Sequence, residues 1–436
     1  MAAKDSPTAT FPTTIPRPSH NISRADISEG ALKVLYRLKH AGFEGYLVGG
    51  GVRDLLLGRE PKDFDIVTDA RPEQVRGLFR NCRLIGRRFR LAHVRFGREV
   101  IEVATFRARV DMGGEGERIE VNGRILRDNV YGTLEEDAWR RDFSINSLYY
   151  NIRDFSVADF TGGMADLRTG TLRLVGDPEV RFREDPVRIV RAVRFAATLG
   201  FRIHPATEAM MSPLAHLLDE VPPARLYEEM LKLFHSGCAA RAFELLQHHD
   251  VFSRLFPPVQ WSLDREQGLS GRMLVVNALQ GTDTRIAEGK PVTPAFLFAA
   301  LLWLPLRQHA EELQQEGLNE ALATQKAANL VLSQQVSRTA LPRRITNMIR
   351  EIWGLQPRLV DVKRKQALDL LAHPRFRAAY DFLLLRAQTG DEVGDQAQGW
   401  TDLQAAEDAT RRQQVLDRLV RPQRRSRRSS RRREAQ

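Results

Sequence analysis

Two stretches within residues 46–68 combine residue types that bind phosphate and metal. The first is a short apolar segment, Tyr46–Val48, followed by Gly49, Gly50 and Gly51 and then by Arg53. Glycines let the backbone approach a ligand closely, and the N–H groups at the start of a helix favour an anion such as a phosphate. The guanidinium of Arg53 can form two parallel hydrogen bonds to a phosphate. This stretch is therefore a candidate phosphate site.

The second stretch holds two carboxylates, Asp63 and Asp65, ahead of the apolar Ile66 and Val67. Side chains alternate faces along a strand, so we predict that the two carboxylates point the same way. Held side by side they repel each other unless a cation lies between them, and Mg²⁺ prefers such oxygen ligands together with substrate phosphates. A glycine turn alone, or an acidic pair alone, is often an ordinary structural feature. Together they favour a nucleotide-phosphate and metal site.

A third carboxylate, Glu102, lies between Ile101 and Val103 in a segment with strand periodicity. It is either a charge at the edge of a strand or a further ligand facing the metal site. Both alternatives stay open at the level of the sequence.

Two arginine-rich clusters follow. In the first, Arg140, Arg141 and Asp142 are consecutive, a pattern that is usually a surface salt-bridge set. In the second, four charged residues recur every three positions and are predicted to form one ridge on a helix. They are Asp185, Arg188, Arg191 and Arg194. A salt-bridged solvent face is the alternative.

The periodicities predict an α+β fold. Strands and helices alternate between residues 23 and 170, and from about residue 206 the apolar residues have helical spacing. We predict five segments: a disordered arm at 1–22, a head of strands and helices at 23–170, a helical neck at 171–255, a helical body at 256–420 and a disordered basic tail at 421–436. Basic residues between 343 and 377, with Trp353, Phe376 and Tyr380 among them, predict an RNA track on the body. His248, His249 and Asp250 are predicted to end a helix rather than to bind metal.

Composition points to a polyanionic partner. The net charge is +11, and an Arg/Ser-rich tail contacts phosphates through counterion release. The tail arginines assigned to RNA are Arg424, Arg425, Arg427, Arg428, Arg431, Arg432 and Arg433. No run of eighteen apolar residues is found, which excludes a spanning helix at the level of the sequence. Only two cysteines are present, so a reducing cytoplasm is expected.

The clusters resemble the motifs of the nucleotidyltransferase family that holds bacterial poly(A) polymerases and CCA-adding enzymes. The resemblance covers residues 23 to about 390, and Ser144 departs from a family threonine. It implies a polymerase-beta-like head in which Asp63 and Asp65 bind two catalytic Mg²⁺ ions. It also implies that Arg141 contacts the nucleotide and that Asp142 is catalytic near the ribose. Nucleotide-binding roles follow for Gly49, Gly50, Arg53, Arg191 and Arg194, with Asp185 and Arg188 reading the base.

The implied reaction is the transfer of AMP from ATP to an RNA 3′ hydroxyl. The segment 87–94, the helical body and the arginine tail resemble the poly(A) polymerase branch more than the CCA-adding branch. CCA addition to tRNA remains an alternative, and a non-catalytic RNA-binding or annealing protein is a second one. By analogy, RNA chaperones and RNA-degradation proteins are expected partners.

Overall fold

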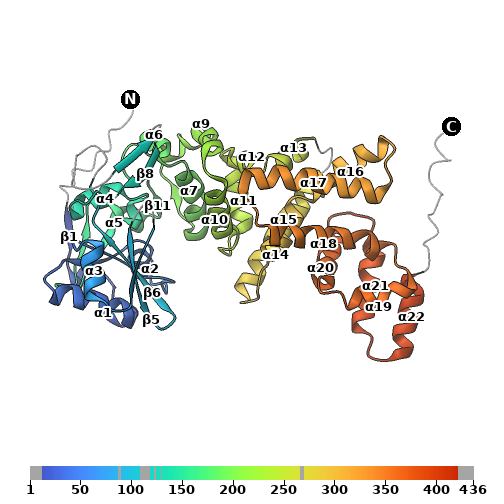
Figure 1. Ribbon diagram of the computed structural model, residues 1–436, viewed down its shortest axis with the longest axis horizontal. Helices are drawn as coiled ribbons and strands as arrows, with labels where there is room; N and C mark the ends of the chain where they lie inside the picture. Colours follow the sequence, from blue (N-terminus) through green and yellow to red (C-terminus); the bar gives the residue numbers. More distant parts are fainter. Residues whose placement is uncertain are drawn as a thin grey trace. The chain divides into compact units, whose positions relative to one another are not determined.

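The computed structural model (Figure 1) describes residues 12–86, 90–108, 118–121, 124–128, 130–265 and 270–420. The chain falls into two compact units, divided between Leu218 and Asp219. The first unit is a mixed sheet with helices and the second is helical, so the predicted α+β fold is confirmed. The finer division into head, neck and body stays a prediction.

An eight-stranded sheet organises the first unit, with the strand order β1-β10-β9-β2-β3-β6-β5-β4. Its strands are β1 (Thr13–Ile15), β2 (Gly45–Val48), β3 (Asp65–Thr68), β4 (Cys82–Ile85), β5 (Leu91–Phe96), β6 (Glu99–Thr105), β9 (Leu148–Asn151) and β10 (Val157–Asp159). Neighbouring strands are antiparallel except β3 and β6, which are parallel. The start of β3 therefore lies beside the middle of β6 in the sheet.

Helices α1 (Glu29–His40) and α3 (Pro72–Leu78) cover one face of this sheet. Ser28 caps α1 by accepting a hydrogen bond from the N–H of Ala31, as its position before an apolar repeat predicts. Leu35 and Leu38 of α1 are fully buried against the strands. Burial of such side chains contributes roughly 1.5–3 kcal/mol each, so this face is a firm support for β3 and β6.

The opposite face is covered over only part of its width. Helix α4 (Leu134–Arg140) begins with a capping box between Thr133 and Glu136. It packs Ala138 against Val48, Val67 and Tyr149, which lie on β2, β3 and β9. Helix α2 (Gly50–Leu56) contacts β2 and β9 as well. Helix α4 therefore lies over the β9–β2–β3 half of the sheet.

The first unit also contains a separate two-stranded sheet of β7 (Arg118–Val121) and β8 (Arg124–Asp128). Its other elements are η1 (Arg17–Ser19), η2 (Arg24–Asp26), η3 (Ser144–Asn146), α5 (Gly163–Thr169), β11 (Thr171–Leu172), α6 (Pro178–Glu184), α7 (Val187–Leu199), β12 (Arg202–Ile203), α8 (Pro205–Glu208), α9 (Met211–Leu214) and η4 (Ala215–Glu220), which runs two residues past the division. Helix α7 is buried along most of its length, with Ile189, Val190 and Val193 fully enclosed. It therefore holds its arginines on a rigid support.

The second unit consists of helices α10 (Pro223–Phe234), α11 (Ala239–His248), α12 (Val251–Leu255), α13 (Pro257–Arg265), α14 (Ser270–Ala287), α15 (Pro294–Leu301), α16 (Trp303–Gln315), α17 (Glu320–Thr339), α18 (Arg343–Val360), α19 (Arg364–Leu371), α20 (Phe376–Gln388), α21 (Gly394–Ala405) and α22 (Ala409–Leu419). No described helix of either unit is long and apolar enough to cross a membrane.

The structure corrects two local predictions. Residues 13–15, predicted to belong to a disordered arm, form β1 and pair with β10, because that strand otherwise has a free edge. Trp353, Phe376 and Tyr380, predicted to interleave an RNA track, are buried in the core. The indole N–H of Trp353 donates to the carbonyl of Ala299, which satisfies it inside the protein. The track is thus left without the aromatic side chains assigned to it.

Candidate active site

Three carboxylates meet at the start of β3. Asp65 is the first residue of β3 and pairs in register with Glu102 of β6, so both side chains lie on the same face of the sheet. Asp63 precedes β3 in an exposed turn. Its predicted place on the strand is therefore wrong, because pairing with β2 begins only at Asp65.

The electrostatics of Asp65 identify a cluster whose negative charge is only partly compensated. Burial, followed by the negative charge of Glu102 and then that of Asp63, raises the pKa of Asp65 to about 6 against the lowering effect of Arg141. Such a group favours a cation, because bound positive charge would offset both the burial and the repulsion. Three carboxylate oxygens are the donor set of a hard cation such as Mg²⁺. The residues present fit that ion.

The raised pKa of Asp65 predicts a stability effect. The Asp65→Asn variant is expected to be more stable than the wild type in metal-free buffer, by on the order of 1–2 kcal/mol after allowing for partial exposure. Because the folded-state pKa is above the unfolded value, the gain is full above pH 6 and is lost as the pH falls toward 4. Thermal unfolding at a series of pH values checks this. An equal gain at pH 4 and pH 7.5 would show that charge is not the cause.

Gly49 lies directly beside the carboxylates. Its φ of +75° is a left-handed conformation that favours glycine. A Cβ at this position would lie 3.5 Å from Oδ2 of Asp65 and 3.7 Å from Nη1 of Arg141. The turn between β2 and α2 thus brings the backbone next to both a carboxylate and a guanidinium, as the glycine cluster predicts.

Arg141 is held in place by two buried side chains that the sequence did not single out. Its Nε donates to the hydroxyl of Tyr149 at 2.9 Å, and its Nη2 donates to Oδ2 of Asp137 at 3.1 Å. The Tyr149 hydroxyl in turn donates to the same carboxylate oxygen at 2.9 Å. Burial raises the pKa of Tyr149 far above its ordinary value, so this hydroxyl stays protonated. Asp137 and Tyr149 are therefore positioning residues for Arg141.

Loosening this clamp is expected to impair the use of Arg141. In the Asp137→Asn variant one charged partner of Arg141 is lost, and we expect the KM of the nucleotide to rise about five- to twentyfold, which corresponds to roughly 1–2 kcal/mol. The effect of Asp137→Asn should vanish in an Arg141→Ala background, because both changes then act on one interaction. Steady-state kinetics of the two single variants and the double variant test this. Additive effects would contradict the positioning role.

Asp142 is fully paired. Its Oδ2 accepts hydrogen bonds from Arg191, at 2.9 Å from Nε and 2.5 Å from Nη2, and its Oδ1 accepts from the amide of Asn146 at 3.2 Å. Burial acts to raise the pKa of Asp142, but Arg191, Asn146 and the N–H of Phe143 outweigh it and hold the pKa well below the usual range. The carboxylate thus ties α7 to the segment that follows α4.

Asn146 extends this pairing to the glycine turn. Its side-chain oxygen accepts from Nη1 of Arg53 at 2.8 Å, and Arg53 also pairs with Asp54 at 2.8 Å. The predicted residues Arg53, Asp142 and Arg191 therefore belong to one network through Asn146. No role for Asn146 is predicted from the sequence, although Asn146 is the last residue of the stretch 140–146 that resembles the family motif.

The ring of Phe195 gathers three of the predicted nucleotide-binding arginines. The guanidinium carbons of Arg194, Arg53 and Arg191 lie 4.3, 5.1 and 5.4 Å from its centroid. Cation–π contact of this kind offsets part of the repulsion between like charges. It concentrates positive charge on the α2 and α7 side of the carboxylates.

The predicted ridge of Asp185 with three arginines is not continuous. Helix α6 ends at Glu184, Asp185 follows as its C-cap, and α7 starts at Val187. Arg188 is buried and donates to the carbonyl of Arg181 and to Glu184, whereas Arg191 turns to Asp142. The proline after Asp185 breaks the helix, which the three-residue spacing did not reveal. The base-reading roles of Asp185 and Arg188 stay predictions.

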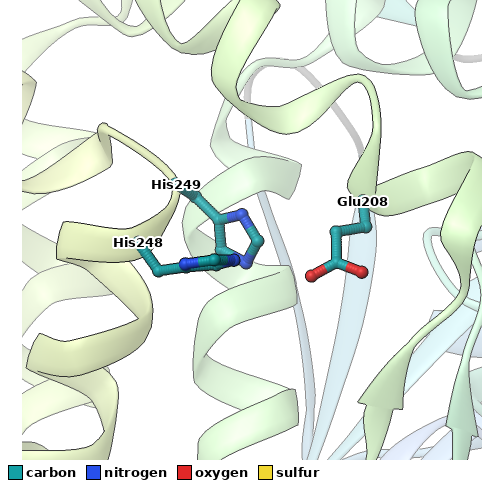
Figure 2. A group of neighbouring side chains, drawn as sticks. All are labelled: Glu208, His248 and His249. Carbon is teal, nitrogen blue, oxygen red and sulfur yellow. The ribbon is translucent and has the colours of Figure 1, made fainter.

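Two further predictions concern other parts of the chain. The tail arginines from Arg424 to Arg433 lie outside the described residues. His248 ends α11 and His249 caps it, with ring centroids 4.7 Å apart (Figure 2). Asp250 adopts a left-handed φ of 57°, typical of a helix terminus. The predicted helix end is confirmed, whereas the absence of metal binding stays a prediction, because Glu208, His248 and His249 place ligand atoms within 4.8 Å of one another.

A mixed sheet that presents three carboxylates next to a glycine turn and an arginine cluster defines a nucleotidyltransferase. The family models agree and cover most of the chain: "Poly A polymerase head domain" matches residues 45–173, "Probable RNA and SrmB-binding site of polymerase A" matches 200–262, and "Polymerase A arginine-rich C-terminus" matches 316–435. The chain belongs to the bacterial poly(A) polymerase I family. The predicted family and enzyme class are confirmed.

The similarity to named relatives separates the two branches of the family. The chain is 50% identical to poly(A) polymerase I of Escherichia coli over 95% of this chain and 91% of the relative. It is 33% identical to a CCA-adding enzyme of Lactobacillus helveticus over 59% of this chain and 66% of the relative. The crystal structure of Bacillus stearothermophilus CCA-adding enzyme in complex with CTP matches 90% of this chain and 82% of that chain, with a TM-score of 0.57 and 26% identity.

Proposed function

We propose that the protein extends RNA 3′ ends with adenylate, transferring AMP from ATP to the 3′ hydroxyl without a template. The observation that carries this proposal is the 50% identity to a poly(A) polymerase I over 95% of the chain, a span that includes the three carboxylates. In the reaction a bond forms between the RNA 3′ oxygen and the α-phosphorus, the α–β phosphoanhydride bond breaks, and pyrophosphate leaves.

Asp63 and Asp65, with Glu102 on the neighbouring strand, would hold two Mg²⁺ ions. When bound, such ions make the 3′ hydroxyl a better nucleophile and stabilise the charge on the leaving pyrophosphate. The Arg141 guanidinium supplies fixed positive charge beside Gly49 and Asp65. The protein thus provides both the ligands and a counter-charge that needs no rearrangement during the reaction.

The remaining residues orient the nucleotide. Gly49, Gly50, Arg53, Arg191 and Arg194 would contact the triphosphate, because they lie at the glycine turn or around Phe195. Arg141 would contact the nucleotide beside the carboxylates. The four hydrogen bonds that Asp142 accepts favour a positioning role for it through Arg191 and Asn146 rather than a ligand role.

Asp185 and Arg188 would select adenine. A carboxylate acceptor and a guanidinium donor at the start of α7 can discriminate base edges without a template strand. The burial of Arg188 and its bonds to Arg181 and Glu184 give it a fixed position, which base selection requires.

We also propose a cytoplasmic site of action, where RNA and ATP meet, with RNA chaperones and RNA-degradation proteins as partners. The added tails would then mark RNAs for decay. The arginine tail of residues 421–436 would hold many RNA sequences without reading them, since contacts to phosphates carry no sequence information.

The nucleotide preference tests this proposal. An unstructured RNA is incubated with Mg²⁺ and with each nucleoside triphosphate separately, and product length is compared with the pyrophosphate released. Long tails from ATP, one pyrophosphate per AMP, and little use of CTP are expected. Tight RNA binding with no extension by any nucleotide would instead support an RNA-binding protein.

A further inference from the structure

One row of side chains leads from the metal site to the edge of the sheet. Asp65 pairs with Glu102, Glu102 pairs with His93 of β5, and His93 pairs with Arg83 of β4. Residues paired across neighbouring strands point to the same face. The row therefore starts at the reacting carboxylates and ends at a guanidinium on the edge strand, about 14 Å away at a spacing of about 4.8 Å per strand.

Within the part of the chain that the structure describes, this part of the sheet face is open. Along β4 the side chains of Arg83 and Ile85 are exposed, and along β5 Arg95 is exposed on the same face. Ile85 exposes 39% of its surface, which is unusual for an isoleucine in a strand. Helices α1 and α3 lie on the other face, where Val94 and Ile101 are buried. Helix α4 packs over the β9–β2–β3 half instead.

The open face carries Arg83 and Arg95 and belongs to a strongly basic stretch of the chain. Residues 74–98, which contain β4, β5 and the end of α3, hold eight arginines and no acidic residue. Among the described residues, Arg83 and Arg95 share no ion pair with any carboxylate. Unpaired guanidinium groups around exposed apolar side chains suit a single-stranded nucleic acid, whose phosphates and bases meet them together.

The distribution of arginines around the carboxylates indicates which substrate binds to the open face. The arginines that we assign to the nucleotide lie on the α2 and α7 side, gathered around Phe195. Two substrates that react at one cluster of carboxylates must approach it from different sides. The open face of β6, β5 and β4 is the side that the nucleotide leaves free.

We propose that the open face of β4 and β5 binds the last nucleotides of the RNA, with Arg83 and Arg95 contacting backbone phosphates and the 3′ hydroxyl reaching the carboxylates. Nε2 of His93 donates one hydrogen bond to Oε1 of Glu102 at 3.1 Å and so positions that carboxylate at the junction. The inference rests on the proposed nucleotidyl transfer, since it assigns the second substrate of that reaction.

RNA binding without ATP tests the proposal independently of catalysis. The full-length protein and its Arg83→Ala/Arg95→Ala variant are titrated into a labelled unstructured RNA of about eight nucleotides, within the usual size of a single-strand site. The dissociation constant of the variant should rise about tenfold at low salt. The slope of log affinity against log salt should flatten by about 1.4, since each single-strand phosphate contact contributes about 0.7.

Arg76→Ala is the matched control, because Arg76 is an exposed arginine of α3 on the covered face of the sheet. Arg76→Ala should leave the dissociation constant and the salt slope nearly unchanged. The Arg83→Lys/Arg95→Lys variant should have the same salt slope as the wild type. The proposal is overturned if the double alanine variant binds like Arg76→Ala or loses affinity with no change in slope. If the binding results are as expected but no nucleotide is added by the wild type, the proposed function fails while the binding face stands.

Discussion

The Asp63→Ala variant is expected to lose nucleotide addition by on the order of a thousandfold or more, because it removes the side chain that we propose as a ligand of the metal that activates the hydroxyl and the leaving group. Asp63 is exposed and precedes β3, so its removal should not disturb the sheet. RNA affinity should stay within about twofold of the wild type, since loss of one exposed acid changes a basic surface little. Initial rates of AMP incorporation and RNA titrations measure the two quantities.

Glu60→Ala is the control for Asp63→Ala, since Glu60 is an exposed acid in the same segment. It should retain near wild-type rates. Activity of Asp63→Ala at a level similar to Glu60→Ala would mean that Asp63 is not a metal ligand. The cluster would then have to work through Asp65 and Glu102 alone.

The Arg191→Ala variant is expected to lose about 2–4 kcal/mol of stability, because it leaves the buried Asp142 carboxylate without its charged partner. The pairing holds the pKa of Asp142 well below its usual value. Its stabilisation is therefore fully present above the unfolded pKa of about 4 and is lost as the pH falls through the folded pKa. The difference between variant and wild type should be largest at neutral pH and should shrink on acidification.

Denaturant unfolding at pH 7.5 and pH 3.5 measures this difference, with Arg183→Ala as the control. Arg183 pairs with Glu179 on the exposed side of α6, where both side chains are 54% exposed. Such a pair contributes at most about 0.5 kcal/mol. If Arg191→Ala and Arg183→Ala cost the same, the bond to Asp142 is not what ties α7 to the rest of the first unit.

The sequence predicts most of the acidic site because its chemistry is local. Gly49 lies in the turn that precedes α2, and Asp63 and Asp65 lie just before and at the start of β3. Their short separation along the chain is therefore enough to predict that they lie close together. The role of Glu102 cannot be predicted from the sequence, because its place depends on which strands pair. Only the parallel register of β3 with β6 brings it beside Asp65. Strand order is a long-range property that periodicity does not encode.

The residues that position Arg141 cannot be predicted from the sequence for a related reason. Asp137 and Tyr149 are twelve residues apart and on different elements, yet both bind Arg141. A buried acid next to a tyrosine has no periodic signature, and its partner is defined only by packing. The aromatic residues assigned to an RNA track were predicted to be exposed but are buried. Helical spacing cannot distinguish a buried stripe from an exposed one when basic residues flank it.

The most direct test of the proposed activity compares two RNAs, one unstructured and one a tRNA that lacks its 3′ CCA, each with ATP alone, CTP alone and both. Poly(A) addition predicts long tails from ATP on the unstructured RNA and on the tRNA, with little incorporation of CTP. Addition of three nucleotides to the tRNA alone, first from CTP and then from ATP, would contradict the proposal and make the protein a CCA-adding enzyme.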